Sequence, residues 1–552
     1  MEDTGDDAVL AFTLAKGLLK YKRHAYRRSG PANTEDSLVL KHNAVVFREE
    51  GRDTPLFLIH EGTGNVTCLL SLAQKLEGEF PIYGVELKDS DPVSSVENLA
   101  AYHLRTIRTI QPHGPYRLAG YSFGGLAAYE ITYQLLGENE EVSFLGLIDT
   151  YPPGAVKHAI AHAQTPAAYP MTPAFQNGQS DLAQLRITHA SIASAVKYYV
   201  RPINIPVRLF VAANSAAGET TSTCWESLSV CEIRSHSVPG DHQTMIAEPL
   251  VGALAQKMSA AIRQRSDAVS SAAQLTPRSA AFVINEHKRS DGVVFCFPGA
   301  GAPITSFLAL AESLTIPLNM IGLQPRGLDG RQVPHATVEA AVSSYLDTIL
   351  KFDPNGPYRL LGHSFGGWLA FETASRLASL GKKVLPVLLL DTDPPSGRQE
   401  RLPKYDQQTV LTRYLRQFEK HTRVDHSIDA RKFDFSSERE QLSELQTANI
   451  ISKSTVESPI YRSLCVYHAN VNTAYMPKTP LGQDIYLFQT ADIDADDPES
   501  ISLDESQKRW RVWAPNLKPV FIEGNHMTML RRPYIDSVAE LARTIWIVES
   551  GD

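Results

Sequence analysis

The chain has 552 residues, a length typical of about three domains or of two large ones. Hydrophobic residues make up 43% and charged residues 21% of the sequence, as in globular proteins, and no apolar run is long enough to span a bilayer. The formal charge of −8 gives no electrostatic reason to expect nucleic acid, and five cysteines without C-x-x-C spacing argue against a disulfide framework or structural zinc. We therefore expect a cytoplasmic protein.

Residues 1–36 precede the first strand-like run. Residues 8–19 are apolar, but four acidic residues come before them and a basic run, Lys20 to Arg28, comes after them. This polarity is the reverse of that of a signal peptide, so the segment predicts a helix of about 20 residues and not a targeting signal. The basic end could bind an acidic partner, although an ordinary solvated helix end is the favoured interpretation.

An internal repeat organises the rest of the chain. Residues 112–135 and 354–377 are identical at 14 of 24 positions, at a constant offset of 242 residues. A period this long indicates a duplicated domain, because solenoid units are much shorter. Residues 266–280 are rich in Ser and Ala and have the composition of a linker. The expected domains are therefore residues 37–265 and 281–552.

Each copy alternates short apolar runs with longer helical stretches. Buried strands of a mainly parallel sheet have this pattern, with helices on both faces, so each copy is predicted to be an α/β domain. The strand-like runs are Leu56–Ile59, Tyr116–Ala119, Phe144–Ile148 and Val207–Val211 in the first copy, and Val293–Phe297, Tyr358–Leu361, Val387–Leu390 and Ile485–Phe488 in the second.

A G-x-S-x-G motif follows one such run in each copy and opens a predicted helix. The motifs are residues 120–124 and 362–366, centred on Ser122 and Ser364. In a nucleophile elbow the serine sits on a strained turn, and the glycines let strand and helix approach closely. Glycines packed around an inert serine are the alternative, but two matches in register make it improbable.

A serine nucleophile needs a base and an acid, which should follow in the order acid, then histidine. Asp149 and Asp391 each lie 27 residues after their serine, directly after an apolar run, and Asp393 is a rival in the second copy. His242 and His526 occur near the end of each copy in a shared G-x-H-x-T-M setting. A plain surface histidine is the alternative for each.

Backbone amides should form an oxyanion hole beside each serine. One donor is expected from the residue after the nucleophile, and one from the small-residue loop after an early strand, residues 60–64 or 298–302. The expected donors are Phe123 and Gly62 in the first copy, and Phe365 and Ala300 in the second. Two tryptophans at similar positions ahead of the histidines, Trp225 and Trp513, are expected in the cores.

These motifs make each copy resemble a thioesterase domain of the kind that ends nonribosomal peptide synthetases and related polyketide synthases, within the α/β-hydrolase superfamily. The resemblance rests on GPYRLAGYSFGGLAAYE, LIDTYPPG and GDHQTM in the first copy, and on VVFCFPGAGAPITSF, GPYRLLGHSFGGWLAFE, LLLDTDPP and GNHMTML in the second. The tandem pair resembles the double thioesterase ends of some bacterial lipopeptide synthetases. This resemblance implies two tandem α/β-hydrolase domains.

The resemblance also implies a reaction. An acyl or peptidyl chain passes from the phosphopantetheine thioester of a carrier protein to the serine, and leaves by hydrolysis or macrocyclisation. No cofactor or metal is expected, and the carrier protein would be on another chain or on another part of a larger synthetase. A helical lid is implied between acid and histidine, at about residues 150–205 and 392–482. One copy would release product while the other edits or assists.

One residue departs from the family pattern. Glu61 stands in the oxyanion loop where the family more often has proline or an aromatic residue, and an acid there could oppose negative charge in the transition state. Two other functions remain open. One is a serine esterase or acyltransferase that acts on free esters or CoA thioesters. The other is a docking protein in which at least one copy is catalytically silent.

Overall fold

The computed structural model describes residues 39–41, 44–87, 94–153, 178–198, 200–214, 225, 233–272, 280–395, 405, 409–410, 413–414, 459–490 and 501–548. The chain divides into two compact units between Leu275 and Thr276, apart from short exchanged segments. The helix expected within residues 1–36, and most of both expected lids, lie outside the described residues.

The two units share one plan of alternating strands and helices. The first contains β1 (Val39–Lys41), β2 (Ala44–Arg48), β3 (Leu56–Ile59), η2 (Thr67–Leu69), α2 (Leu70–Lys75), β4 (Ile82–Val85), α3 (Val96–Ile110), β5 (Tyr116–Tyr121), α4 (Phe123–Gly137), β6 (Val142–Ile148), α6 (Gly178–Lys197), β7 (Val207–Ala212), β8 (Ile233–Val238), η4 (Thr244–Ile246) and α8 (Val251–Ala272). The second contains β9 (Ala281–Asn285), β10 (Val293–Phe297), η5 (Ile304–Phe307), α9 (Leu308–Ser313), β11 (Asn319–Leu323), α10 (Val338–Phe352), β12 (Arg359–His363), α11 (Phe365–Ser379), β13 (Val387–Leu390), α14 (Pro459–Val471), β14 (Ile485–Thr490), α15 (Leu503–Arg511), β15 (Leu517–Ile522), η6 (Thr528–Leu530) and α16 (Tyr534–Val548).

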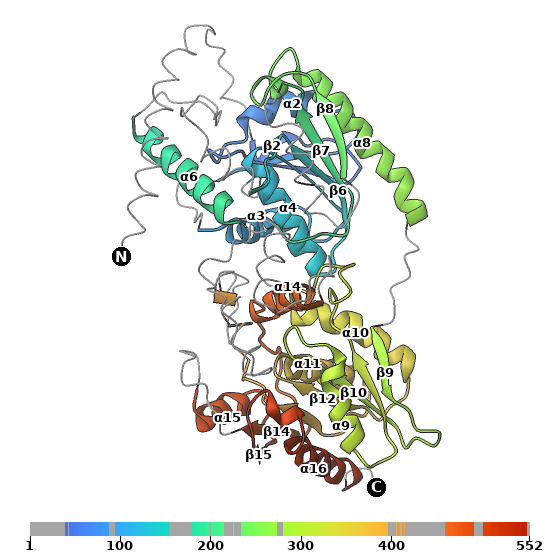
Figure 1. Ribbon diagram of the computed structural model, residues 1–552. Coiled ribbons are helices and arrows are strands. Elements are labelled where there is room, and N and C mark those ends of the chain that lie inside the picture. The colour runs from blue at the N-terminus through green and yellow to red at the C-terminus, as the bar shows by residue number, and fades with distance from the viewer. Residues whose placement is uncertain are drawn as a thin grey trace. The chain divides into compact units, whose positions relative to one another are not determined.

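Both sheets have the same strand order around a parallel centre. The first is ordered β1-β2-β4-β3-β5-β6-β7-β8, and the second, read in the same direction, β9-β11-β10-β12-β13-β14-β15. All pairs from β4 to β8, and from β11 to β15, are parallel, while β1, β2 and β9 join antiparallel at one side. Figure 1 shows helices on both faces of each sheet. The predicted class, two tandem α/β-hydrolase domains, is confirmed.

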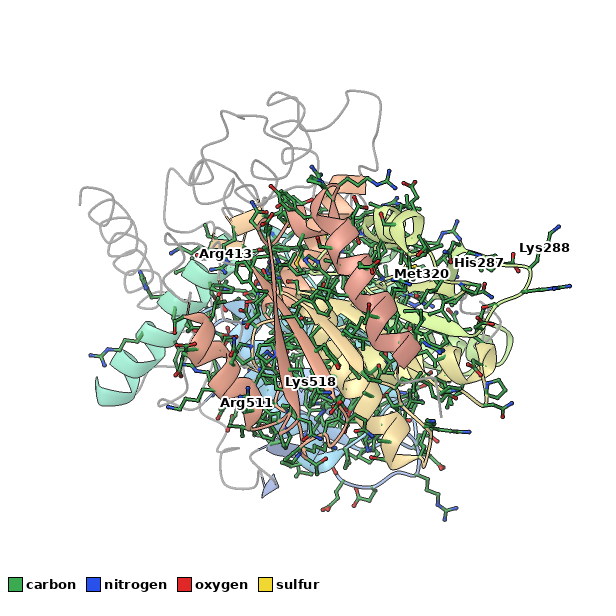
Figure 2. The ribbon with its side chains drawn as sticks, turned by 90° about the horizontal axis from the view of Figure 1, so that it is seen from below. His287, Lys288, Met320, Arg413, Arg511 and Lys518 are labelled. Atoms are coloured by element: carbon green, nitrogen blue, oxygen red, sulfur yellow. The ribbon has the colours of Figure 1, made fainter. Side chains whose placement is uncertain are left out.

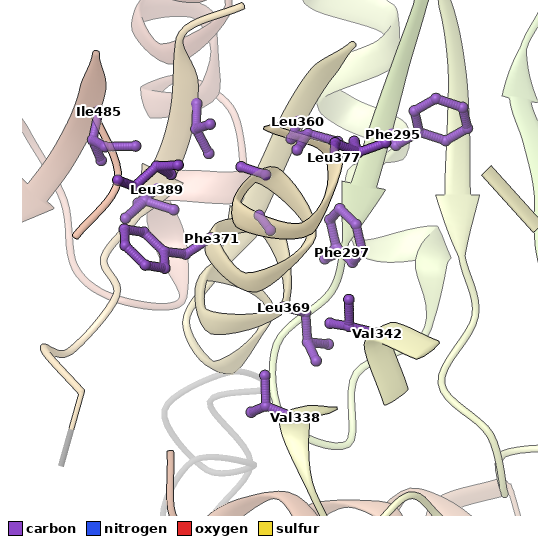
Figure 3. Packing of buried hydrophobic residues seen from close by; sticks show 14 of the residues in the cluster. Phe295, Phe297, Val338, Val342, Leu360, Leu369, Phe371, Leu377, Leu389 and Ile485 are labelled. Atoms are coloured by element: carbon purple, nitrogen blue, oxygen red, sulfur yellow. The ribbon is translucent and has the colours of Figure 1, made fainter. Parts of the chain in front are cut away.

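Alternate side chains of a central strand point to opposite faces of the sheet and pack into two different hydrophobic cores. In β10, Phe295 and Phe297 pack with α10 and α11 on one face, whereas Val294 and Cys296 pack with α9 and α16 on the other. Figure 3 shows α11 among side chains of this first set, which includes Leu369 and Phe297. Because these strands are buried on both faces, they read as continuous apolar runs, and all eight predicted runs form strands.

The strands that the sequence did not predict are short or lie at the side of a sheet. β4 and β11 each contain a glycine, which weakens the strand signal. The edge strand β15 carries Pro519 and the exposed Lys518, both of which discourage pairing with another chain. Figure 2 labels Lys518, which forms an ion pair with Asp484 and lies over the ring of Tyr486.

The predicted linker at residues 266–280 is partly wrong. Helix α8 continues to Ala272, so the first part of this segment is helical. Residues 273–279 lie outside the described part of the chain.

Among the described residues, no helix is long and apolar enough to cross a membrane. Cys68, Cys296 and Cys465 are free thiols.

Candidate active sites

Each G-x-S-x-G motif forms a sharp turn between a central strand and a helix. Ser122, between β5 and α4, has φ of 57°, and Ser364, between β12 and α11, has φ of 53°. Non-glycine residues rarely adopt this left-handed conformation, and such strain is concentrated at functional sites. A Cβ on Gly124 would lie 2.1 Å from the carbonyl oxygen of His60, so only glycine lets the helix approach the strands.

A further glycine of the elbow was not singled out in the sequence. A Cβ on Gly125 would lie 1.8 Å from Oγ1 of Thr150, and one on Gly367 would lie 2.0 Å from Oγ1 of Thr392. Each threonine directly follows the acid of its copy. The doubled glycine after each serine is the signal that could have predicted this contact, by which the elbow helix packs against the acid turn.

In the first unit, the structure brings the predicted serine, acid and histidine together. His242 lies between β8 and η4, with Nε2 3.1 Å from Oγ of Ser122 and Nδ1 2.6 Å from Oδ2 of Asp149. The other carboxylate oxygen of Asp149 accepts a hydrogen bond from the amide of Ala212 at 2.9 Å. The side chains of His242 and Asp149 are only 7% and 2% exposed. This contact chain is therefore largely shielded from water.

In the second unit, the corresponding acid and histidine also pair. Nδ1 of His526 lies 2.8 Å from Oδ2 of Asp391, which identifies Asp391 rather than Asp393 as the partner of His526. The amide of Ser364 donates to the carbonyl of Leu390, so the serine lies next to the acid turn. Burial tends to raise the pKa of Asp391, but the hydrogen bond and charge of His526 lower it overall. The side chains of His526 and Asp391 are 35% and 21% exposed, more than in the first unit.

The residue before each serine supports the histidine from behind. The ring of Tyr121 stacks on that of His242 with centroids 4.8 Å apart, and its hydroxyl donates to the carbonyl of His242. At the matching position, the His363 ring lies 4.8 Å from that of His526, and Nε2 donates to the carbonyl of His526 at 2.9 Å. Burial, followed by the nearby His526, lowers the pKa of His363 to about 3, so this ring is neutral at pH 7.

The predicted oxyanion loops form matching turns beside the elbows. The amide of Gly64 donates to the carbonyl of Glu61, and the amide of Ala302 donates to the carbonyl of Gly299. The expected donors Gly62 and Ala300 therefore occupy the same turn position, and within the described part of the chain neither of their amides donates to an acceptor. Phe123 and Phe365 are the first residues of α4 and α11, where an amide has no intrahelical acceptor.

The carboxylate of Glu61 turns back onto its own loop. Its Oε2 accepts the amide of Thr63 at 2.9 Å, and its Oε1 accepts the Thr63 hydroxyl. Behind the loop, Nδ1 of His60 lies 2.6 Å from the Glu61 carbonyl, and Nε2 lies 2.9 Å from Nε2 of the buried His103. Burial, followed by the nearby His60, lowers the pKa of His103 well below its ordinary value. The His60 ring therefore contacts the loop and is backed by the neutral ring of His103.

Trp225 and Trp513 were expected in the cores: Trp225 is fully buried, and Trp513 is partly buried and packs against the core of the second unit. Nε1 of Trp225 donates to the carbonyl of Thr150 at 2.8 Å, and the residue that repeats this contact is Trp510, which donates to Thr392 at 2.9 Å. Both indoles are fully buried. Trp510 lies on α15 and faces the core, while Trp513 lies one helical turn further on and is partly buried.

Comparison with known proteins identifies both units. The family described as "Thioesterase domain" matches residues 54–262 and 293–545. Atromentin synthetase invA5 of Paxillus involutus is 34% identical over 135 residues, which are 22% of this chain and 14% of that protein. Polyketide synthase PksR of Bacillus subtilis (strain 168) is 40% identical over 110 residues, 19% of this chain and 4% of that protein. The chain thus matches only small parts of these longer relatives.

The matches to solved structures have low TM-scores. The Vlm2 thioesterase domain bound with a dodecadepsipeptide is 22% identical, with a TM-score of 0.35, and the match covers 48% of this chain and 97% of that domain. The NocB thioesterase domain from the nocardicin cluster is 18% identical, with a TM-score of 0.34 over 48% of this chain and 98% of that one. Because the two family matches together cover most of its length, the chain belongs to the thioesterase domain family.

Proposed function

We propose that each unit is a serine thioesterase that releases an acyl or peptidyl chain from the phosphopantetheine arm of a carrier protein. The observation that carries the proposal is the contact chain from Ser122, on a strained elbow, to the buried pair of His242 and Asp149. Ser364, His526 and Asp391 would have the same roles in the second unit. The sequence relatives, which include a polyketide synthase, support a substrate delivered within natural-product biosynthesis.

The proposed reaction has two half-reactions. Nε2 of His242 removes the proton from Ser122 as Oγ attacks the thioester carbonyl, and the proton then passes to the departing pantetheine sulfur. The product is an acyl-serine ester. Water, or a hydroxyl or amine of the acyl chain, then attacks this ester, His242 takes the attacking group's proton, and Ser122 recovers it on release. Asp149 accepts the Nδ1–H bond throughout and stabilises the imidazolium.

The oxyanion of each tetrahedral intermediate would bind to two backbone amides. In the first unit these are Gly62 and Phe123, and in the second Ala300 and Phe365. A donor of this kind contributes about a hundredfold or more to the rate. The Glu61 carboxylate is engaged by Thr63, which supports retention of activity in the first unit despite the acid in its oxyanion loop.

The proposal includes a division of work between the units. The interval from acid to histidine is 93 residues in the first unit and 135 in the second, and the acid–histidine pair is more exposed in the second. Water reaches an exposed acyl-serine more easily, so we propose that the units differ in the balance of hydrolysis and ring closure. Equal product profiles from Ser122→Ala and Ser364→Ala would refute this part.

The test is the intact-protein mass after treatment with an alkyl fluorophosphonate. Wild type should carry two adducts, and Ser122→Ala and Ser364→Ala should carry one each. A single adduct that is lost with only one variant would favour a silent docking copy. Comparison of pantetheine thioesters with free esters of the same acyl group separates a thioesterase from a general esterase, and faster turnover of the free ester would overturn the thioesterase assignment.

A further inference from the structure

Helix α14 contacts the backbone of the second oxyanion loop directly. Oγ of Ser463 donates to the carbonyl of Gly301 at 2.6 Å, and the amide of Gly301 donates to Oδ1 of the buried Asn470 at 3.2 Å. Ser463 and Asn470 are seven residues apart, which places them on one face of the helix. Gly301 has φ of 65°, and a Cβ there would lie 2.7 Å from the Ser463 carbonyl oxygen and from Cβ of Tyr467. Helix and loop are therefore in backbone contact.

The hydrogen bonds of Ser463 and Asn470 with Gly301 fix the orientation of the oxyanion loop, and so which of its amides is left to bind the oxyanion. The Gly301 amide belongs to the peptide group after Ala300, and its hydrogen is used by Asn470. The bond from Ala302 to Gly299 closes the turn on the other side. Ala300 is thus held from both directions, and its own amide remains as the donor. Asn470 and Ser463 set the direction of that amide without touching the substrate.

The segment that follows α14 is hydrogen-bonded to α11, the helix that begins at the nucleophile elbow. Tyr475, just beyond the end of α14, donates its hydroxyl to Oε2 of Glu372 on α11 at 3.0 Å. Glu372 is eight residues after Ser364 on the helix that begins at the nucleophile. Helix α14 therefore links the nucleophile helix to the oxyanion loop, so a shift of α14 would change the position of the loop relative to the serine.

In the first oxyanion loop, the amide equivalent to that of Gly301 has an acceptor within the loop. The residue equivalent to Gly301 is Thr63, and the Thr63 amide donates to the carboxylate of Glu61 within the loop. The contact described between α6 and this loop is apolar, since Ile187 Cγ2 lies 3.2 Å from where a Cβ of Gly64 would be. Glu61 thus does locally what Asn470 does from a distant helix, 169 residues along the chain from Gly301.

We propose that Ser463 and Asn470 are positioning residues for the oxyanion hole of the second unit, so that its catalysis depends on the placement of α14. In the first unit, Glu61 of the loop itself accepts the equivalent amide, that of Thr63. This inference rests on the proposed function, because it assigns the Ala300 amide to the oxyanion. It gives the two units different sensitivities: whatever displaces α14 lowers turnover in the second unit, while the first unit is unaffected by the matching change in α6.

The test uses the full chain in a Ser122→Ala background, which leaves only the second serine to react. Asn470→Leu and Ser463→Ala should lower kcat for octanoyl-pantetheine about tenfold or more with KM unchanged, since a misplaced donor loses part of the hundredfold that a whole donor supplies. The rate of phosphonylation by an alkyl fluorophosphonate should fall in parallel. Ser463→Thr, which keeps the hydroxyl, should retain activity.

Matched variants in a Ser364→Ala background measure the turnover of the first unit alone. Ile187→Ala should leave kcat within about twofold, whereas Glu61→Leu should lower it as Asn470→Leu does in the second unit. A final yield of one adduct per chain shows that each variant is folded. An unchanged kcat in Asn470→Leu, or an equal loss in Ser463→Thr, would overturn the positioning role alone. No adduct on the Ser122→Ala parent would overturn the nucleophile Ser364 and this inference with it.

Discussion

Replacement of Glu130 by glutamine should strongly destabilise the first unit. Glu130 lies on α4, 1% exposed, and its Oε2 accepts hydrogen bonds from Nη2 of Arg201 at 2.6 Å and from the hydroxyl of Tyr198 at 2.9 Å. The Arg201 side chain is 7% exposed and also lies over the ring of Tyr133. Burial alone would lower the pKa of Arg201, but the charge of Glu130 raises it well above its ordinary value. A guanidinium is not deprotonated in proteins, so Arg201 stays charged when its partner is removed.

The loss follows from the burial of both partners. Removal of one member of a buried ion pair costs about 3–5 kcal/mol, because the other charge stays desolvated. For a domain of this size each kcal/mol lowers Tm by roughly 2–4 °C, so the expected drop is about 6–20 °C. The matched variant Glu372→Gln in the second unit should cost only about 1–2 kcal/mol. Its ion-pair partner, Arg376, is 28% exposed and can be solvated by water.

Calorimetry of the full chain measures both effects, since each variant should shift the transition of one unit. The double variant Glu130→Gln with Arg201→Met removes both charges and should recover a large part of the lost stability, which a double-mutant cycle expresses as a coupling energy. The reasoning would be refuted if Glu130→Gln cost less than about 1 kcal/mol, or if the double variant were no more stable than the single one.

Three further predictions concern the second unit. Gly366→Ala would place a Cβ 2.0 Å from the carbonyl oxygen of Phe297, so it should lower Tm by several degrees and abolish phosphonylation of that unit. The pKa of His363 falls from 6.5 to about 3 on folding. The contribution of this group to the free energy of unfolding should therefore be complete above about pH 6.5, and should fall by up to about 4 kcal/mol as pH falls toward 3. His363→Tyr should remove much of this pH dependence in acid denaturation. Trp510→Phe leaves the buried carbonyl of Thr392 without its donor, which should cost about 1–3 kcal/mol and lower kcat.

Each of these has a contrary result. Normal phosphonylation of Gly366→Ala would mean that the helix can retreat from the strand without loss of the elbow. An identical acid profile in His363→Tyr would assign the pH dependence to other groups, such as Asp391, whose pKa is also lowered. Full stability and turnover in Trp510→Phe would show that the acid turn is held without the indole.

The chemistry-bearing residues could be predicted from the sequence because each follows a local pattern. A G-x-S-x-G turn, an acid directly after an apolar strand and a histidine before a closing helix are short signals, and the repeat at an offset of 242 residues displays two of them twice. Buried parallel strands read as continuous apolar runs, which is why all eight predicted runs form strands. Half-exposed strands such as β8 have no such run and were missed.

The supports of those residues were decided by the tertiary structure. Asn470 meets Gly301 across 169 residues, and Trp510, not Trp513, is the tryptophan that donates to the carbonyl of Thr392. Glu61 reads as a charge that opposes the transition state until its contact with Thr63 is seen. A side chain's partners depend on which distant segments pack against it, and sequence periodicity carries only the local part of that information.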